Sequence, residues 1–155
     1  MVFQKQERKL FEELIKHIPL LRELGIALVP FCPLGRGFLT GTAKRSDDYP
    51  KNDFRRGDPR MQGKNYETNM EIVSIVVSIA QRNRSTSAQI ALAWLLQKGH
   101  DIVPIPGTKR RSYLEENIGS AKLKLSNADI QELDNALPKV SGNRYNEQHM
   151  AYIDR

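Results

Sequence analysis

Three consecutive cations, Lys109, Arg110 and Arg111, follow a short apolar run and a Gly-Thr pair in the stretch DIVPIPGTKRRSYLEEN. The apolar run predicts a buried strand, and the acid-bearing residues after the cations predict a helix. A helix N-terminus offers free backbone N–H groups and the positive end of the helix dipole, and a preceding glycine lets an anion approach the backbone. Gly107, Thr108 and the cations therefore suit a phosphate group. A solvated basic turn explains the same spacing equally well.

A second glycine-containing loop, CPLGRGFLTG, follows an earlier apolar run, IALVPF. It places Gly35 and Gly37 on either side of Arg36. If the two apolar runs are parallel strands, both loops leave at the same carboxyl end, which is where α/β folds bind ligands. Glu116 and Asn117 lie further along the helix and could hydrogen-bond a purine edge, although such a pair is usually just surface. Two converging loops favour a nucleotide over a solvated turn.

The other reactive side chains form no catalytic pattern in the sequence. Cys32 is the only cysteine, so no intrachain disulfide can form, and this suits a reducing compartment. Without a neighbouring base it is interpreted as a small buried hydrophobe rather than a nucleophile. His17, His100 and His149 are interpreted as surface histidines, and no set of metal ligands is apparent.

The composition is that of one soluble globular domain: 155 residues, 39% hydrophobic and 27% charged. The net charge of +6 favours anionic ligands. Nucleic-acid binding is not expected, because no basic stripe interleaved with aromatic residues is present. No apolar run approaches the roughly 18 residues of a membrane span, and the first residues lack the apolar core of a secretory signal. We therefore expect a cytoplasmic protein without a membrane partner.

The spacing of apolar residues predicts helices that alternate with two strands. A first helix is expected over 10–21, ending at Gly25. Residues 42–65 are polar and rich in turn formers, which predicts a long irregular loop. The alternation indicates the α/β class, yet two parallel strands alone leave both sheet edges open. The two predicted strands are at 26–31 and 101–106, and a helix is predicted over 70–80. A further helix is expected to begin at a Thr86/Gln89 capping box, and another after the turn over 107–112. The last predicted helix begins at a Ser126 N-cap and ends before Pro138.

Four stretches together resemble the C-terminal part of aldo-keto reductases, above all the microbial and plant members with PLGRGFLTG and PIPGTKR motifs. They are GIALVPFCPLGRGFLTG, DFRRGDPRMQGKNYETNMEIV, SAQIALAWLLQKGHDIVPIPGTKRRSYLEENIGSAKLKLS and GNRYNEQHM. The resemblance covers 13–155 and leaves 1–12 as an atypical segment. It implies the C-terminal portion of a (β/α)8 TIM barrel, incomplete in this chain. It also implies NADP(H) lying across the carboxyl face, and NADP-dependent reduction of a small aldehyde or ketone by the complete enzyme.

The resemblance also implies which residues contact the cofactor. Phe31 corresponds to an aromatic ring that stacks on the nicotinamide, and Arg56 to an arginine that closes over the cofactor. Lys109 and Arg110 correspond to a clamp for the 2′-phosphate, whereas a site for NAD would offer a carboxylate to the ribose hydroxyls. The remaining implied contacts are the pyrophosphate loop of Cys32, Pro33, Leu34, Gly35 and Arg36, the 2′-phosphate pocket residues Gly107 and Thr108 with Tyr113 beside them, and the adenine pair Glu116 and Asn117.

The catalytic Asp, Tyr, Lys and His of the family belong upstream of the stretches that match here. The Asn and Gln that hold the nicotinamide carboxamide also belong upstream. No catalytic residue is therefore assigned, and we expect the chain alone to be inactive. A frameshift or an alternative start in a once-complete gene would explain the unusual residues 1–12. The alternative interpretation is a non-catalytic NADP(H)-binding module, or a module that completes a barrel by pairing with another chain.

Overall fold

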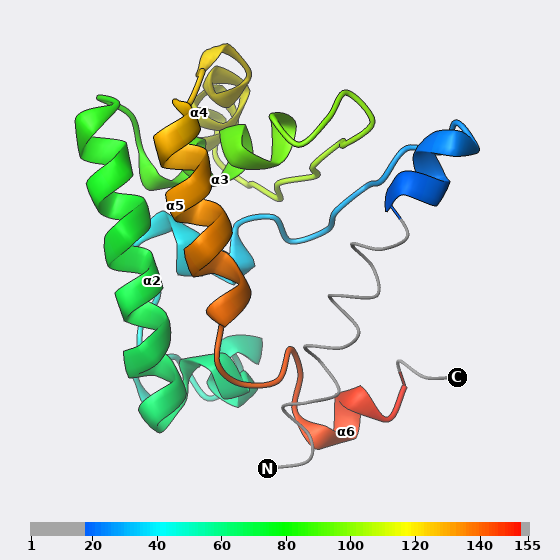
Figure 1. Ribbon diagram of the computed structural model, residues 1–155. Helices are drawn as coiled ribbons and strands as arrows, with labels where there is room; N and C mark the ends of the chain where they lie inside the picture. Colours follow the sequence, from blue (N-terminus) through cyan, green and yellow to red (C-terminus); the bar gives the residue numbers. More distant parts are fainter. Residues whose placement is uncertain (1–17, 153–155) are drawn as a thin grey trace.

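Helices dominate residues 18–152, which are the residues that the computed structural model of the protein describes (Figure 1). No helix in this range is long and apolar enough to cross a membrane. Residues 18–23 are also helical. The α-helices after them are α2 (Gly63–Arg82), α3 (Ser87–Leu96), α4 (Arg111–Gly119), α5 (Asn127–Ala136) and α6 (Glu147–Met150). Short 3-10 helices fill the connections: η1 (Gly35–Thr40), η2 (Ser46–Asp48), η3 (Phe54–Gly57), η4 (Pro59–Met61), η5 (Ser120–Lys122) and η6 (Leu137–Lys139).

The main hydrophobic core lies between α2, α3 and α5. Figure 1 shows α2 and α5 side by side and antiparallel. Ile79 of α2, Ile90 of α3 and Leu133 of α5 are completely buried in this cluster. Trp94 of α3 donates its indole N–H to Asp134 of α5 at 2.6 Å, and this bond holds α3 against α5. The predicted helix over 70–80 is confirmed and extends further in both directions as α2.

The predicted first helix is described only at its C-terminal end, because 10–17 lie outside the described residues. Gly25 takes a φ of +67°, a left-handed conformation that glycine adopts without steric cost. The Ile26 N–H then bonds to the Leu21 carbonyl at 2.8 Å, the pattern of a Schellman C-cap. The prediction of Gly25 as the helix stop is confirmed.

Both predicted N-caps are confirmed, and the second one joins two helices. Thr86 and Gln89 form a reciprocal capping box at α3, as do Ser126 and Asp129 at α5. The Asp129 carboxylate also accepts hydrogen bonds from Arg82 at 2.7 Å and from Asn83 at 3.2 Å, so the start of α5 is bonded to the end of α2. Burial raises the pKa of Asp129, but the bonds from Ser126, Arg82 and Asn83 together hold it below its ordinary value.

Asp129→Ala is expected to lower the free energy of unfolding by about 2–3 kcal/mol at neutral pH, because it removes a buried acceptor of charge-assisted hydrogen bonds. A depressed folded pKa contributes stability above the ordinary value of 3.8, and that stability is lost as the pH falls through the lower folded value. Urea unfolding of both proteins at pH 7 and near pH 2.5 measures this. If the two proteins differed in free energy of unfolding as much near pH 2.5 as at pH 7, this prediction would be contradicted.

The two predicted strands meet as parallel segments but do not form a regular sheet. Within the described residues their pairing consists of two isolated parallel bridges, Leu28 with Ile102 and Phe31 with Ile105. The predicted parallel direction is confirmed. The prediction of regular strands at 26–31 and 101–106, and with it an α/β sheet within this chain, was wrong for 18–152.

Proline explains why the pairing between the two bridges is interrupted. Leu28 donates to a carbonyl on the opposite segment, and the Val103 N–H donates back to the Leu28 carbonyl at 2.9 Å, which completes one rung. Pro30 has no N–H, so the next rung keeps only the bond from the Ile105 N–H to the Pro30 carbonyl, at 3.4 Å. The two segments are therefore held in register by few bonds.

The loop predicted over 42–65 is irregular but well packed. Its chain runs through η2, η3 and η4, and α2 begins at Gly63. Tyr49 and Met61 from this loop are buried against Phe38 of η1 and Val73 of α2 in a second hydrophobic cluster. This segment is therefore packed in place between the glycine loop, residues 32–41, and α2.

Candidate functional site

The glycine loop and the cationic turn, residues 107–111, both follow the carboxyl end of the paired segments 26–31 and 101–106. The Phe31–Ile105 bridge is parallel and lies at the carboxyl end of both segments. Each segment continues directly from that bridge into its loop, at Cys32 on one side and Pro106 on the other. Cys32 is exposed, so its interpretation as a buried residue was wrong. The convergence expected from the sequence is thus present, and this end is the candidate site.

The cationic turn has an ordered backbone and exposed charges. Thr108 Oγ1 accepts from the Arg110 N–H at 3.2 Å and donates to the Arg110 carbonyl at 3.1 Å, which fixes the turn just before α4. A side chain at Gly107 would meet no atom within 4 Å, so its backbone is open to a ligand. Lys109 is exposed and makes no hydrogen bond or ion pair with another described residue. These groups fit a phosphate.

The second and third cations have protein partners of different kinds. The Arg110 guanidinium lies 5.4 Å from the centre of the Tyr113 ring, and one of its nitrogens is 3.5 Å from the Tyr113 hydroxyl. Arg111 pairs with Glu115 at 3.0 Å on the surface of α4, although both side chains are well exposed. Exposed pairs of this spacing are weak. Arg110 thus remains close to the turn, whereas Arg111 is directed along the helix.

Glu116 and Asn117 differ in how far they can reach a ligand. Asn117 is buried, and its carbonyl accepts from the Ser120 hydroxyl at 2.6 Å. Glu116 is half-buried, and its carbonyl accepts from the Gln89 side chain at 3.1 Å. Their backbone is fixed by α3 and η5, and Glu116 has the more accessible side chain.

Arg36 binds other parts of the protein. It lies at a φ of +58°, and its guanidinium forms an ion pair with buried Asp58 at 2.6 Å. The same nitrogen, Nη1, donates to the Arg144 carbonyl at 2.9 Å. The guanidinium also lies over the rings of Phe54 and Tyr145, at 5.0 and 4.6 Å from their centres. The resemblance implied that Arg36 lines the pyrophosphate, whereas its charged group lies among protein partners in the structure.

Arg56 also binds the protein backbone. Its Nη1 donates to the carbonyls of Asp47 and Tyr49, at 2.9 and 2.8 Å, so its charged end organises the 42–61 loop. Beside it, hydrogen bonds from the Arg55 side chain and backbone lower the pKa of Asp53 to about 2. Closure of Arg56 over a cofactor remains a prediction.

The tail, residues 141–150, contributes to the site in a way that was not predicted from the sequence. The stretch GNRYNEQHM resembled the family, but no cofactor-site role was predicted for it, and Arg144 lies 3.9 Å from the centre of the Phe31 ring. Tyr145 and His149 pack against each other with ring centres 6.4 Å apart, and Phe54 contacts both. One signal was available: Asn146 caps α6 by accepting from the His149 N–H at 3.0 Å, so this stretch had a helix start.

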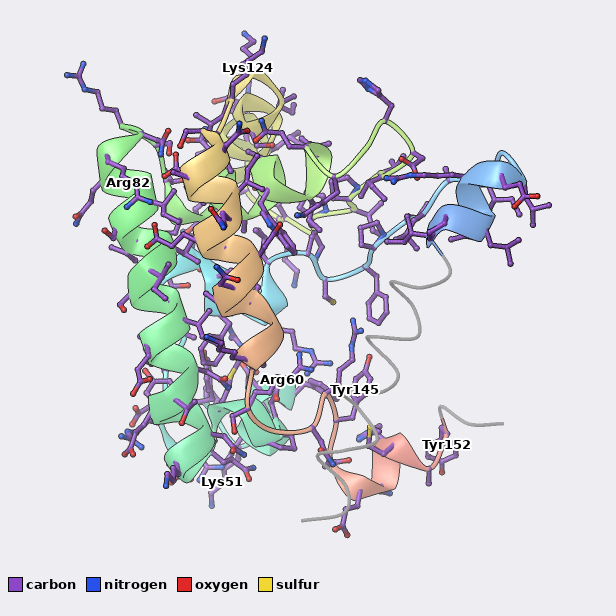
Figure 2. All side chains as sticks on the ribbon, in the orientation of Figure 1. Lys51, Arg60, Arg82, Lys124, Tyr145 and Tyr152 are labelled. Carbon is purple, nitrogen blue, oxygen red and sulfur yellow. The ribbon has the colours of Figure 1, made fainter. Side chains whose placement is uncertain are left out.

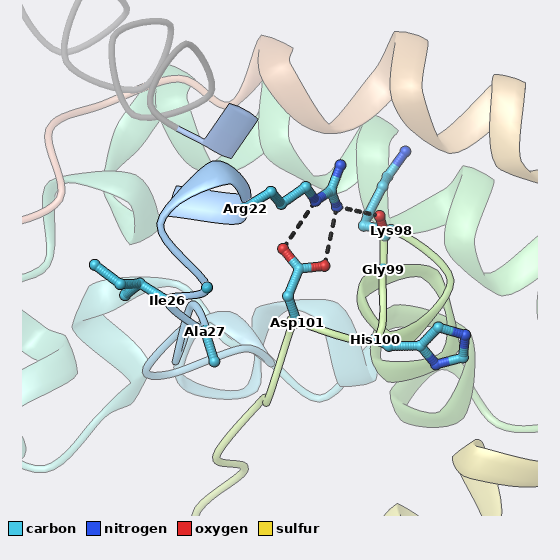
Figure 3. A pocket seen from close by; sticks show the side chains of 8 residues that line it. Arg22, Ile26, Ala27, Lys98, Gly99, His100 and Asp101 are labelled. Atoms are coloured by element: carbon cyan, nitrogen blue, oxygen red, sulfur yellow. Dashed lines mark hydrogen bonds and ion pairs between the residues drawn. The ribbon is translucent and has the colours of Figure 1, made fainter. Parts of the chain in front are cut away.

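A cavity of about 610 Å³ lies at the opposite, amino end of the paired segments (Figure 3). Arg22 crosses it, bonding to the Asp101 carboxylate at 2.9 Å and to the Lys98 carbonyl at 2.7 Å. The hydrogen bond from Arg22 lowers the pKa of Asp101. His100 lines the same cavity and is exposed, as its interpretation as a surface histidine predicted. The Arg22 contacts fasten the 18–23 helix to the 101–106 segment. Within 18–152, no group of His, Cys, Asp and Glu could hold a metal ion.

Comparisons with known proteins agree with the resemblance. Aldo-keto reductase yakc of Schizosaccharomyces pombe, named as an NADP(+) enzyme, is 52% identical over 128 residues, which are 80% of this chain and 37% of that protein. Probable aldo-keto reductase 1 of Glycine max is 44% identical over 130 residues, 83% of this chain and 37% of that protein. Among solved structures, a glycerol dehydrogenase from Gluconobacter oxydans matches the fold with a TM-score of 0.70 at 21% identity, over 84% of this chain and 39% of that one.

The chain spans less than two fifths of the length of these relatives. The model of the Aldo/keto reductase family matches residues 2–138, which includes most of the segment that the sequence analysis set apart as atypical. Because that match covers far more than half of the chain, the protein belongs to the aldo/keto reductase family.

Proposed function

We propose that this chain is the cofactor-binding, C-terminal part of an NADP-dependent carbonyl reductase with a (β/α)8 barrel. The observation that carries the proposal is the parallel Phe31–Ile105 bridge, because it brings the glycine loop and the cationic turn to one end. The naming of the yeast relative as an NADP(+) enzyme supports the choice of cofactor. A cytoplasmic location and a small aldehyde or ketone substrate remain predictions.

Each residue of the turn has a defined role in this proposal. Lys109 and Arg110 hold the 2′-phosphate through charge-assisted hydrogen bonds, and the open backbone at Gly107 lets the phosphate approach. Phe31 offers a half-exposed ring at the end of its segment. When bound, the cofactor would supply the hydride for carbonyl reduction. The residues of this chain would bind and orient it.

The chain is expected to bind NADP and adenosine 2′,5′-bisphosphate more tightly than NAD, because only the first two carry the 2′-phosphate. Affinity will be modest, since ordering the loops opposes binding. Calorimetric titration or saturation-transfer NMR measures the preference. Glu116→Ala is a matched control, because a contact to adenine is common to all three ligands and its loss should weaken them alike. Equal affinity of the unmutated chain for NAD and NADP would contradict the proposed cofactor.

A second candidate function is completion of a barrel by pairing with another polypeptide. Val29, Phe31, Val103 and Ile105 are each about half exposed although they lie in the paired segments. Open strand edges with exposed apolar side chains pair with other chains or aggregate. This favours a partner that would cover the two segments.

The isolated chain is therefore expected to self-associate, and the double variant Val103→Thr, Ile105→Thr is expected to shift it towards monomer. Thr keeps the β-branched shape and removes apolar surface. Sedimentation velocity over a range of concentrations measures the change. A monomeric unmutated chain with a sharp, cooperative thermal transition would contradict the exposed-edge argument.

A further inference from the structure

Two sets of polar contacts hold the tail, residues 141–150, to the body of the protein, in addition to the packing of Phe54 against Tyr145 and His149. At the first, the Asn69 side chain accepts from the Ser141 N–H at 2.7 Å and donates to the Ser141 carbonyl at 2.8 Å. Asn69 is buried, and Gly142 follows at a φ of +89° with no room for a side chain beside Pro59. This first point fixes where the tail leaves η6 (Figure 1).

The second point is Arg36, which reaches from the glycine loop to the tail. Its Nη1 bonds to Asp58 and to the Arg144 carbonyl, at 2.6 and 2.9 Å. Asp58 is buried and also caps η4 by accepting from the Arg60 N–H at 3.0 Å. Figure 2 shows Arg60 and Tyr145 at this junction. A single guanidinium thus joins the glycine loop, the start of η4 and the tail.

The position of the tail determines which face of the Phe31 ring is covered by protein. The Arg144 guanidinium lies 3.9 Å from the centre of the ring, so it covers one face. Phe31 as a whole is 48% exposed, so the residue keeps accessible surface beyond the face that Arg144 covers. A cation stacked on one face restricts the rotation of the ring and leaves the opposite face for a planar ligand.

We propose that Arg36 is a positioning residue: its ion pair with Asp58 fixes the tail so that Arg144 backs Phe31 and presents the open face of that ring to the ligand. The identity of the ligand rests on the proposed function. The contact between Arg36 and the Arg144 carbonyl does not depend on which ligand binds.

Trypsin reports on the contact directly, because it cleaves after Arg144, at the carbonyl that Arg36 holds. Asp58→Asn keeps the η4 cap but removes the charge opposite Arg36. It is expected to speed cleavage after Arg144 roughly fivefold or more, relative to cleavage after exposed Lys124, because it weakens a charge-assisted contact and proteolysis follows the population of the opened segment. Arg45→Gln, which breaks the exposed Arg45–Glu67 pair, is the control and should leave that ratio unchanged. An unchanged ratio in Asp58→Asn would overturn the proposal.

Arg36→Gln, alone and combined with Asp58→Asn, tests whether the two groups act together. The double variant should be cleaved no faster than either single variant, since residues that act through one contact are not additive. Circular dichroism verifies that each variant keeps its helices. Additive increases would show that Arg36 and Asp58 act separately, and would overturn the proposal.

Ligand binding separates this inference from the proposed function. Asp58→Asn should weaken NADPH roughly fivefold, because the nicotinamide end needs Phe31, and should leave adenosine 2′,5′-bisphosphate unchanged, because it needs only the cationic turn. Tighter NADPH binding would mean that Arg144 blocks the ring, and an equal loss for both ligands would mean general damage. Either result overturns the inference. If neither ligand binds the unmutated chain, the proposed function fails, while the trypsin ratio still decides whether Arg36 fixes the tail.

Discussion

The double variant Lys109→Ala, Arg110→Ala is expected to bind NADP and NAD with equal affinity. A hydrogen bond to a charged group contributes about 1.5–3 kcal/mol, so losing two of them weakens NADP by roughly 10²–10⁴-fold at most. NAD lacks the 2′-phosphate and should be almost unaffected. Titration of both ligands against both proteins measures the preference. The loss should be largest at low salt, because exposed charges are screened.

Arg111→Ala is the matched control for this experiment. It removes a cation from the same stretch, but this side chain is paired with Glu115 along α4. The net charge falls by one in this control and by two in the double variant, so Arg111→Ala, Lys122→Ala matches the charge as well. A preference for NADP that survives in the Lys109, Arg110 double variant would show that these cations are not a phosphate clamp.

Local patterns predicted the helices well. Apolar spacing identified α2, and the pairs Thr86/Gln89 and Ser126/Asp129 identified two helix starts, because a capping box is a contact between residues three apart. Gly25 identified a helix end because glycine adopts the left-handed conformation of a C-cap without steric cost. Each of these features depends on a few neighbouring residues, so the sequence contains all that is needed to predict it.

Features that depend on distant residues were predicted less well. An apolar run such as 26–31 predicts a strand only if neighbouring strands supply donors and acceptors on both sides. In the described residues it has one neighbour, and Pro30 lacks the N–H for the next rung. Arg36 presented the same difficulty, since the Arg144 carbonyl that it binds lies 108 residues further along the chain. Spacing within the glycine loop could not reveal this contact.

Residues 1–155 alone are expected to give no NADPH-dependent reduction of 4-nitrobenzaldehyde above a control without protein. The proton donor expected of the family is a tyrosine with a lysine and a histidine beside it. In the described residues Tyr145 does pack against His149, but arginines flank this tyrosine: Arg36 and Arg144 both lie over its ring. A guanidinium does not release a proton in proteins, so it cannot relay one to a tyrosine. Loss of general acid assistance alone costs about 10²–10⁴-fold.

Tyr145→Phe separates an unexpected activity from a contaminant. If the unmutated chain reduces the aldehyde and Tyr145→Phe does not, the tail itself contains an acid site, and the expectation of inactivity is wrong. If the chain is inactive, the decisive addition is a polypeptide corresponding to the part of the Schizosaccharomyces pombe relative that this chain does not match. Turnover that appears only in the mixture, and is lost with the Lys109→Ala, Arg110→Ala variant, would establish that these residues supply the cofactor site to a catalytic half on another chain. If the mixture turned over equally fast with the Lys109→Ala, Arg110→Ala variant, the cofactor site would instead lie outside the cationic turn.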